Sequence, residues 1–260
     1  MQLRDEVALI TGASRGIGRA IALRFTQEGA RVVIAARGTP DLQSLSETIR
    51  SMGGEALAIA CDVSEEAAAR AMVRQAEEHF GKVGVLVNNA GYFPTLYPAQ
   101  HMPEEEWERT LKLNLTSAFH VSRAALEGMQ ARRRGSIIMI SSTAAMAAYP
   151  FGAPYAAAKA AMLGLARTLA AEGGPYGVRV NAICPGVVAG TEMHERVGKE
   201  LERVSGVTAE QRLEAAQSAT LLRRLATPQD IAAAALFLAS AQSAAITGQT
   251  LYVDGGQFFT

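Results

Sequence analysis

The chain has 260 residues, of which 49% are hydrophobic, so it can bury one large core without requiring a second domain. Lysine plus arginine and aspartate plus glutamate each number 25, and the formal net charge is zero. This balance gives no electrostatic basis for binding nucleic acid or an anionic membrane.

Cysteine and histidine usage predicts no metal site. Cys61 and Cys184 each follow an apolar run, which favours buried free thiols, and the four histidines show no ligand spacing. The amino-terminal stretch MQLRDEVALI lacks the apolar core of a secretion signal, and no apolar run is long enough to span a membrane. We therefore expect a cytoplasmic protein in a reducing environment.

Seven short runs rich in Val, Ile, Leu and Ala recur along the chain, at 6–11, 31–36, 55–60, 83–88, 135–141, 177–184 and 249–254. Such continuous apolar runs are typical of parallel strands that helices cover on both faces. The segments between them have helical character, with candidate N-caps at Asp41, Ser64 and Thr227. The alternation predicts a single α/β domain over 1–260, a doubly wound Rossmann-type sheet of about seven parallel strands with helices on both faces.

Residues 191–220 depart from this rhythm, because the expected crossover helix divides into two pieces. The first piece carries an apolar stripe at helical spacing, formed by Met193, Val197, Leu201 and Val204. Gly206 interrupts it, and Thr208 with Gln211 then matches a capping box at the start of a second helix. An insertion over the carboxyl edge of the sheet predicts a lid for a substrate site.

The first predicted strand runs into the sequence TGASRGIG at 11–18, and a helix is expected from about residue 17 to 28. Gly12, Gly16 and Gly18 let the turn tighten and let a pyrophosphate approach the helix N-terminus. Ligands of such sheets bind beside the carboxyl ends of the strands. The turn therefore predicts a dinucleotide site, the alternative being a plain tight turn.

A larger set of motifs follows in chain order: CDV (61–63), NNAG (88–91), Asn114, ISS (140–142), Tyr155 with Lys159, NAICPG (181–186) and VDGG (253–256). Together with TGASRGIG, this set resembles the short-chain dehydrogenase/reductase family from residue 6 to 256. An isolated Tyr-x-x-x-Lys pair is usually an ordinary surface pair, one helical turn apart. Its place in this set, with Ser142 thirteen residues before Tyr155, indicates a functional pair.

The resemblance implies a nicotinamide dinucleotide held by residues from most of these motifs: Gly12, Ser14, Arg15, Gly16, Ile17, Gly18, Arg37, Asp62, Val63, Asn89, Ala90, Gly91, Tyr155, Lys159, Pro185, Gly186 and Val188. It places Asp62 at the adenine amino group, Asn89 and Ala90 at the ribose, and Val188 at the nicotinamide carboxamide. Thr191 departs from the family pattern, because it stands one position later than the usual threonine.

The end of the second strand favours NADP(H) over NAD(H). Relatives that prefer NAD end this strand with an aspartate that binds the ribose 2′-hydroxyl, whereas here Ala36 is followed by Arg37. Arg37 can pair with a 2′-phosphate, and Arg15 can add a second cation. If Arg37 is merely solvated, NAD(H) is the alternative.

Reducing a ketone requires a hydride at carbon and a proton at oxygen. The resemblance makes Tyr155 the acid/base, and the ammonium of Lys159 is expected to lower the tyrosine pKa from about 10. It further implies that Lys159 binds the nicotinamide ribose, that Ser142 orients the substrate oxygen, and that Asn114 anchors a proton-relaying water chain. Ser141 is a rival to Ser142, but neighbouring strand residues face opposite sides, and the family spacing selects Ser142.

The loop at 143–154, TAAMAAYPFGAP, is expected to border the substrate and has no charged residue. A buried carboxylate without a cation is costly, so the loop favours a neutral ketone or secondary alcohol over a keto acid. The candidate wall residues, each equally explained by ordinary packing, are Tyr92, Phe93, Leu96, Tyr149, Phe151 and Met193. A lid cation (His194, Arg196 or Lys199) is the alternative that would admit a carboxylate.

Three other functions share these motifs. A 3-oxoacyl-[acyl-carrier-protein] reductase needs basic residues to dock its acidic carrier, but the segment after NNAG is apolar and acidic. An NAD-dependent hydroxy acid or diol dehydrogenase is the second, and a dinucleotide-sensing regulator is the third, although a sensor needs no Ser–Tyr–Lys–Asn set. The resemblance also implies a homotetramer that pairs through the helix carrying Tyr155 and through the final strand.

Overall fold

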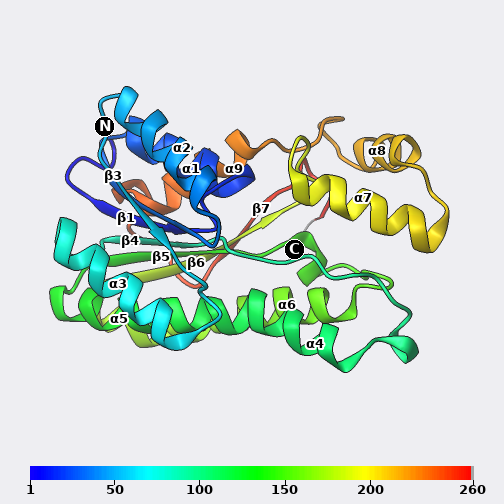
Figure 1. Cartoon of the computed structure of the whole chain (residues 1–260), viewed down its shortest axis with the longest axis horizontal. Helices are drawn as coiled ribbons and strands as arrows, with labels where there is room; N and C mark the ends of the chain where they lie inside the picture. Colours follow the sequence, from blue (N-terminus) through cyan, green and yellow to red (C-terminus); the bar gives the residue numbers. More distant parts are fainter. Residues whose placement is uncertain (259–260) are drawn as a thin grey trace.

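The computed structural model describes residues 1–258, and its frame is one sheet of seven parallel strands with helices on both faces (Figure 1). The strands are β1 (Val7–Thr11), β2 (Arg31–Ala36), β3 (Ala56–Ala60), β4 (Val85–Asn88), β5 (Gly135–Ile140), β6 (Val178–Pro185) and β7 (Thr250–Val253). Their order across the sheet is β3-β2-β1-β4-β5-β6-β7. The predicted fold class is confirmed, and every predicted strand forms within two residues of its expected bounds.

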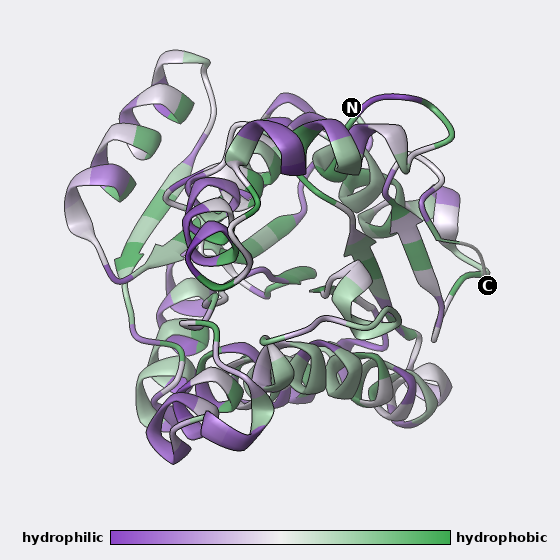
Figure 2. Ribbon diagram, turned by 90° about the vertical axis from the view of Figure 1, so that its right-hand side faces the viewer, coloured by the Kyte–Doolittle hydropathy of each residue, from purple (hydrophilic) through white to green (hydrophobic). Residues whose placement is uncertain are grey.

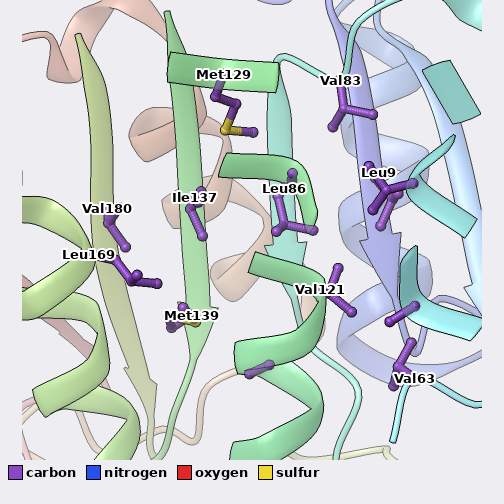
Figure 3. Packing of buried hydrophobic residues seen from close by; sticks show 14 of the residues in the cluster. Leu9, Val63, Val83, Leu86, Val121, Met129, Ile137, Met139, Leu169 and Val180 are labelled. Carbon is purple, nitrogen blue, oxygen red and sulfur yellow. The ribbon is translucent and has the colours of Figure 1, made fainter. Parts of the chain in front are cut away.

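The continuous apolar character of the strands follows from burial on both faces. In β1, Leu9 points into one hydrophobic cluster and Ile10 into the other, as alternating strand residues must. Figure 3 shows Leu9, Leu86 and Ile137 on the first of these faces, with side chains from the covering helices packed against them. Figure 2 shows the largely hydrophobic strands between the two helical layers.

The helices divide between the two faces of the sheet (Figure 1). One face is covered by α1 (Gly16–Gln27), α2 (Thr39–Ser51) and α9 (Pro228–Ala239). The other is covered by α3 (Glu66–Phe80), α5 (Ser117–Arg132) and α6 (Ala153–Gly173), with α4 (Glu104–Leu111) packed against α6. Within residues 1–258, no helix combines the length and the apolar character needed to cross a membrane.

The strand order reverses between β1 and β4, which pair directly although β2 and β3 separate them in the chain. Helices that leave two neighbouring strands in opposite directions open a crevice at the carboxyl ends of those strands. The glycine turn follows β1 and the NNAG motif follows β4, so both open into this crevice. The topology therefore sets the place of the candidate site.

Of the three N-caps predicted at Asp41, Ser64 and Thr227, one is confirmed and two are wrong. Thr227 and Asp230 form a capping box at the start of α9, with Thr227 N donating to the carboxylate over 2.9 Å. Helix α2 begins before Asp41, since Pro40 with its fixed φ suits the first helical turn. Helix α3 begins after Ser64, because the backbone N–H of Ser64 is bound by the carboxylate of Asp62 at 3.0 Å.

The predicted division of residues 191–220 is confirmed as α7 (Glu192–Ser205) and α8 (Ala209–Ser218). Gly206 ends α7 with a left-handed φ of 72°, and Thr208 with Gln211 forms the expected capping box. Helix α7 packs its apolar stripe, Val197, Leu201 and Val204, against a small cluster that contains Tyr155. Met193, the first residue of the predicted stripe, is 40% exposed and lies outside this cluster.

Candidate active site

The glycine turn leaves no room for side chains at the N-terminus of α1. Gly12 and Gly16 adopt left-handed φ values of 63° and 55°, and a Cβ at Gly12 would lie 2.9 Å from the Cα of Ala90. A Cβ at Gly18 would collide with the carbonyl oxygen of Gly12. The side chain of Asn89 donates to the carbonyls of Thr11 and Gly12 at 2.9 and 3.0 Å, which joins the ends of β1 and β4. The result is a bare backbone surface of the kind that admits a pyrophosphate.

The ends of β2 and β3 carry opposite charges side by side. Arg37 is exposed and makes no hydrogen bond or ion pair within the described part of the chain. Burial acts to raise the pKa of Asp62, but hydrogen bonds from Ser64 and the positive charges of Arg37 and Lys112 outweigh it and hold that pKa below its usual range. Asp62 is therefore ionised at neutral pH, with a solvated guanidinium nearby.

Arg15, the second predicted phosphate cation, is already in an ion pair. Its guanidinium binds the carboxylate of Glu192 in the first turn of α7, and both side chains are 62% exposed. Thr191, the N-cap of α7, lies beside Gly16, where a Cβ would be 3.6 Å from the threonine methyl group. The glycine turn and the predicted lid are thus in direct contact.

Tyr155 and Lys159 lie on the buried face of α6, 7% and 4% exposed. The ammonium of Lys159 donates to the carbonyl of Ile140 at 2.9 Å and lies 5.7 Å from the centre of the Tyr155 ring. Ser141 donates to the backbone carbonyl of Lys159 at 2.8 Å, so its hydroxyl faces the helix backbone. Ser142 is half-buried, its hydroxyl accepts from the backbone N–H of Ala144 at 3.1 Å, and it is close enough to Tyr155 to oppose the rise in the pKa of that phenol, so Ser142 is the serine beside the phenol.

The expected lowering of the tyrosine pKa is wrong for this structure. Burial, with a smaller effect of Tyr149, raises the pKa of Tyr155 well above its usual value, and the nearby Ser142 hydroxyl opposes this only in part. Burial also lowers the pKa of Lys159 to about 8. The physical reason is that removing either charged form from water outweighs their mutual attraction, while the ammonium is directed at Ile140. Tyr155 is therefore a neutral phenol, able to donate a proton.

Asn114 lies in a π-helical turn, Lys112–Thr116, between α4 and α5. Its amide accepts from the backbone N–H of Tyr92 at 3.1 Å and donates to the carbonyls of Tyr92 and Thr110, each at 2.9 Å. A Cβ on Gly91 would lie 3.0 Å from Asn114 Oδ1 and 3.7 Å from Lys159 Nζ, so this glycine separates the two side chains. Single π turns often occur at functional sites, but no local sequence signal announced this one.

An aromatic cluster forms the wall beside Tyr155. The ring of Phe93 lies 5.2 Å and that of Tyr149 lies 6.1 Å from the Tyr155 ring, centre to centre, and Leu96 is fully buried among them. Tyr92, another predicted wall residue, is not part of this cluster. Its hydroxyl donates to the carboxylate of Glu106 at 2.9 Å. The guanidinium groups of Arg109 and Arg196 lie 4.6 and 4.8 Å from the centre of its ring.

The remaining predicted cofactor residues lie at the same edge of the sheet: Ser14 and Ile17 in or just after the glycine turn, Val63 after β3, Ala90 after β4, and Pro185, Gly186 and Val188 at or after the end of β6. Val188 is buried and forms a bridge with Ala226. Cys61 and Cys184 are buried free thiols, as predicted. Among the described residues, no three His, Cys, Asp or Glu side chains come together in a way that could hold a metal ion.

Polar contacts that the sequence did not predict hold α7 over the loop after β4. The carboxylate of Glu200 accepts from the backbone N–H of Leu96 at 3.1 Å, and Arg203 donates to the carbonyl of Leu96 at 2.6 Å. Arg196 donates to the hydroxyl of Tyr92 at 3.2 Å. These partners are about a hundred residues apart in the chain, so no spacing rule connects them.

Comparisons with known proteins agree with this geometry. A family model described as Enoyl-(Acyl carrier protein) reductase matches residues 12–257. The short-chain reductase protein NovJ of Streptomyces niveus is 40% identical, covering 98% of this chain and 94% of its own. A variant of actinorhodin polyketide ketoreductase with NADPH superposes with a TM-score of 0.92 at 35% identity, covering 99% and 98% of the two chains.

A second solved structure is 7 alpha-hydroxysteroid dehydrogenase, complexed with NADH and 7-oxo glycochenodeoxycholic acid. It superposes with a TM-score of 0.90 at 34% identity, covering all of this chain and 97% of its own. The full-length matches, the parallel sheet and the Ser142, Tyr155 and Lys159 side chains gathered at its carboxyl edge lead to one conclusion. The chain belongs to the short-chain dehydrogenase/reductase family.

Proposed function

We propose that this protein is an NADP(H)-dependent oxidoreductase that interconverts a ketone and a secondary alcohol, with Tyr155 as the acid/base. The observation that carries the proposal is the neutral, buried phenol of Tyr155 between Ser142 and Lys159, at the sheet edge that also holds the glycine turn. The dinucleotide, when bound, supplies or accepts the hydride.

In the reduction, Tyr155 gives its phenolic proton to the ketone oxygen, which the Ser142 hydroxyl holds in place. The proton transfer leaves a buried phenolate, and the ammonium of Lys159 then stabilises it. Because the pKa of Lys159 is about 8, this amine can gain and lose a proton close to neutral pH. The side-chain-free space at Gly91, between Lys159 and Asn114, is where we place the relaying water.

Two residues support NADP(H) as the dinucleotide. Ala36 leaves no carboxylate at the end of β2 to repel a 2′-phosphate, and Arg37 is exposed and without a partner in residues 1–258. Arg15 would have to leave Glu192 to add a second charge, so Arg37 carries the proposal. The solved relatives above hold NADPH in one case and NADH in the other, and so leave the choice to these residues.

The aromatic cluster supports a substrate with an apolar group next to the reacting carbon. Phe93, Tyr149 and Leu96 pack around Tyr155, and the loop at 143–154 brings no charge to it. Burying an apolar group there contributes roughly 25 cal/mol per Å². We propose that the part of the substrate next to this loop is uncharged. The proposal does not extend to the part next to the lid, because the lid contains charged residues of its own. Met193 remains a proposed contact at the exposed end of α7.

A homotetramer in the cytoplasm is the proposed state of the protein. The outer face of α6 exposes small side chains, at Ala157, Ala160 and Ala161, which permit close approach of a second helix. Strand β7 is the edge of the sheet, and its Leu251 is 37% exposed. Edge strands are usually covered or paired.

Replacing Tyr155 by phenylalanine tests the acid/base. The variant should lose about 10²–10⁴ in kcat with any ketone substrate, because it lacks only the transferred proton. Dinucleotide affinity, measured by fluorescence titration, should change little. The matched control is Tyr176→Phe, which removes a hydroxyl that is exposed on the surface. A Tyr155→Phe enzyme that keeps more than about a tenth of wild-type kcat contradicts the assignment.

Replacing Lys159 by methionine tests the burial of its amine. With a folded pKa of about 8 against an ordinary 10.5, folding below pH 8 must desolvate an ammonium, and this penalty fades as pH rises from 8 toward 10.5. The free energy of unfolding of the variant, measured by denaturant titration, should therefore exceed that of wild type near pH 7 by up to about 3 kcal/mol. This excess should disappear near pH 10.

The control for this pH series is Lys199→Met, because Lys199 is exposed on α7. Its effect on the free energy of unfolding should not depend on pH. If the free energies of unfolding of Lys159→Met and wild type differ by the same amount from pH 7 to pH 10, the low pKa of Lys159 is wrong.

The double variant Ala36→Asp, Arg37→Ile should shift preference from NADPH toward NADH. The new aspartate can bind the ribose 2′-hydroxyl and repels a 2′-phosphate, while the lost guanidinium removes about 1.5–3 kcal/mol of phosphate binding. This corresponds to roughly one to two decades in the ratio of kcat/KM values. Arg50→Ile, which removes an exposed charge at the far end of α2, should leave the ratio unchanged. A wild-type enzyme that already prefers NADH disproves the role of Arg37.

Light scattering at micromolar concentration tests the tetramer. We expect one species of four chains, because the small side chains of α6 and the open edge of β7 each offer a surface for a symmetric contact. Ala160→Arg on the outer face of α6 should reduce the mass, while Ala67→Arg on exposed α3 should not. A monomeric wild-type mass excludes the proposal.

A further inference from the structure

A buried glycine lies in the middle of α7, where it weakens the helix. Gly198 is fully inside Glu192–Ser205, and glycine at such a position costs about 1 kcal/mol relative to alanine. The contact made there explains the residue. A Cβ at position 198 would lie 3.1 Å from Nη2 of Arg212 and 3.6 Å from its Cζ and Nε. The missing side chain lets the guanidinium of Arg212, which comes from α8, lie against the backbone of α7.

This contact is on the inner face of α7. His194, Gly198 and Leu201 follow one another at helical spacing, and Val197 and Leu201 pack against the cluster that contains Tyr155. Arg212 donates to Nε2 of His194 at 3.1 Å, so it spans the same face. The guanidinium therefore lies between α8 and the face of α7 that carries His194, Gly198 and Leu201.

The charges at this wall agree with that position. Burial raises the pKa of Tyr149 to about 12, and the positive charge of Arg212 opposes the rise. An effect of this kind requires the guanidinium to be near the Tyr149 ring, whose centre is 6.1 Å from that of Tyr155.

The positive charge of Arg212 has no counter-charge. It forms no ion pair within residues 1–258, and its Nε is buried without a hydrogen-bond partner. Its two acceptors are the ring and the backbone carbonyl of His194, and both are neutral. The ring is neutral because burial and the adjacent guanidinium lower the pKa of this histidine. A guanidinium can only donate, so Nε2 of His194 must be the acceptor.

Of the neighbouring arginines of the lid, Arg203 has a counter-charge, whereas Arg196 has no ion pair within residues 1–258 either but is exposed, unlike the half-buried Arg212. Arg203 is bound to the carboxylate of Glu200 at 2.8 Å and to the carbonyl of Leu96. Arg196 is bound to the hydroxyl of Tyr92. A half-buried guanidinium without an anion, held in a notch made for it, is arranged to receive one.

We propose that Arg212 binds a carboxylate of the substrate, at the end remote from the reacting carbonyl. The inference rests on the proposed ketone–alcohol chemistry and names its substrate class: keto acids, and the corresponding hydroxy acids, whose carboxylate is separated from the reacting carbon by an apolar stretch. The apolar stretch lies along Phe93 and Tyr149, and the carbonyl meets the uncharged loop at 143–154. The lid cation is thus Arg212, and not His194, Arg196 or Lys199.

The test uses straight-chain methyl ketones with a terminal carboxylate, from 4-oxopentanoate to 7-oxooctanoate, each paired with its primary amide. Turnover is measured with saturating NADPH and with saturating NADH. For at least one chain length, the wild-type enzyme should prefer the acid to its amide by about tenfold or more in kcat/KM, and Arg212→Gln should lower this ratio by roughly 10- to 100-fold. Lys199→Gln removes the same charge from an exposed site on α7 and should change the ratio by less than about twofold.

Gly198→Ala supplies an independent test. The added methyl group displaces the guanidinium, so the preference for the acid should fall, while the helix propensity of alanine keeps the melting temperature at or above that of wild type. If Arg212 had a purely structural role, the variant would not lose its preference for the acid while keeping its melting temperature. A lower melting temperature with unchanged selectivity opposes the inference.

The outcomes separate the two proposals. Turnover of the amides and acids alike, or a ratio that Arg212→Gln leaves unchanged, overturns the carboxylate site and leaves the ketone–alcohol activity standing. If no ketone of the series is turned over with either dinucleotide, the proposed activity fails for this class. Calorimetric titration of 6-oxoheptanoate then decides the site alone: binding that weakens about tenfold or more in Arg212→Gln supports it, and equal or absent binding overturns it.

Discussion

The candidate active site depends on how one residue, Lys159, joins helix α6 to the end of β5. Its side chain donates to the carbonyl of Ile140, and its own carbonyl accepts from the hydroxyl of Ser141. Because the residue is bound both to Ile140, the last residue of β5, and to Ser141 directly after it, these two hydrogen bonds hold the first turns of α6 in place against the sheet. Ser142, next along the chain, is left with its hydroxyl toward Tyr155. The cost is a buried amine, which lowers the pKa of the lysine and leaves the phenol protonated.

The sequence was sufficient for the frame of the molecule because burial on two faces leaves a direct signal. The strands are continuous apolar runs, and the glycine turn needs glycine at Gly12, Gly16 and Gly18 for steric reasons that hold in any such sheet. Helix starts were less certain, because Asp41 and Ser64 are good caps in isolation but neighbouring residues decided the start. The direction of the Tyr155 pKa was missed, because spacing reports that a lysine is near and not how dry the site is.

The lid shows what a sequence pattern leaves out. The two helices of the predicted lid, the break at Gly206 and the capping box of the second helix follow from local rules and agree with the sequence prediction. The attachments of the lid are long-range: Glu192 to the glycine turn, and Arg203 to the loop after β4. The first helix is therefore bound to both sides of the crevice, one that would hold the dinucleotide and one that would border the substrate. Motion of α7 must break polar contacts on either side.

The proposed site combines an uncharged wall, the loop at 143–154, with a cation, Arg212, that comes from a different part of the chain. In the proposed reaction, Ser142 and Tyr155 bind the reacting carbonyl, and a charge in the loop at 143–154 would compete for its oxygen. The guanidinium of Arg212 comes from α8 instead and lies against the backbone of α7 at the notch that Gly198 leaves. Fastening α7 to the crevice fixes that notch. In the proposed reaction, selectivity for charge would thus be separated from the chemistry, since Arg212 of α8 would hold the carboxylate and Tyr155 at the sheet edge would donate the proton.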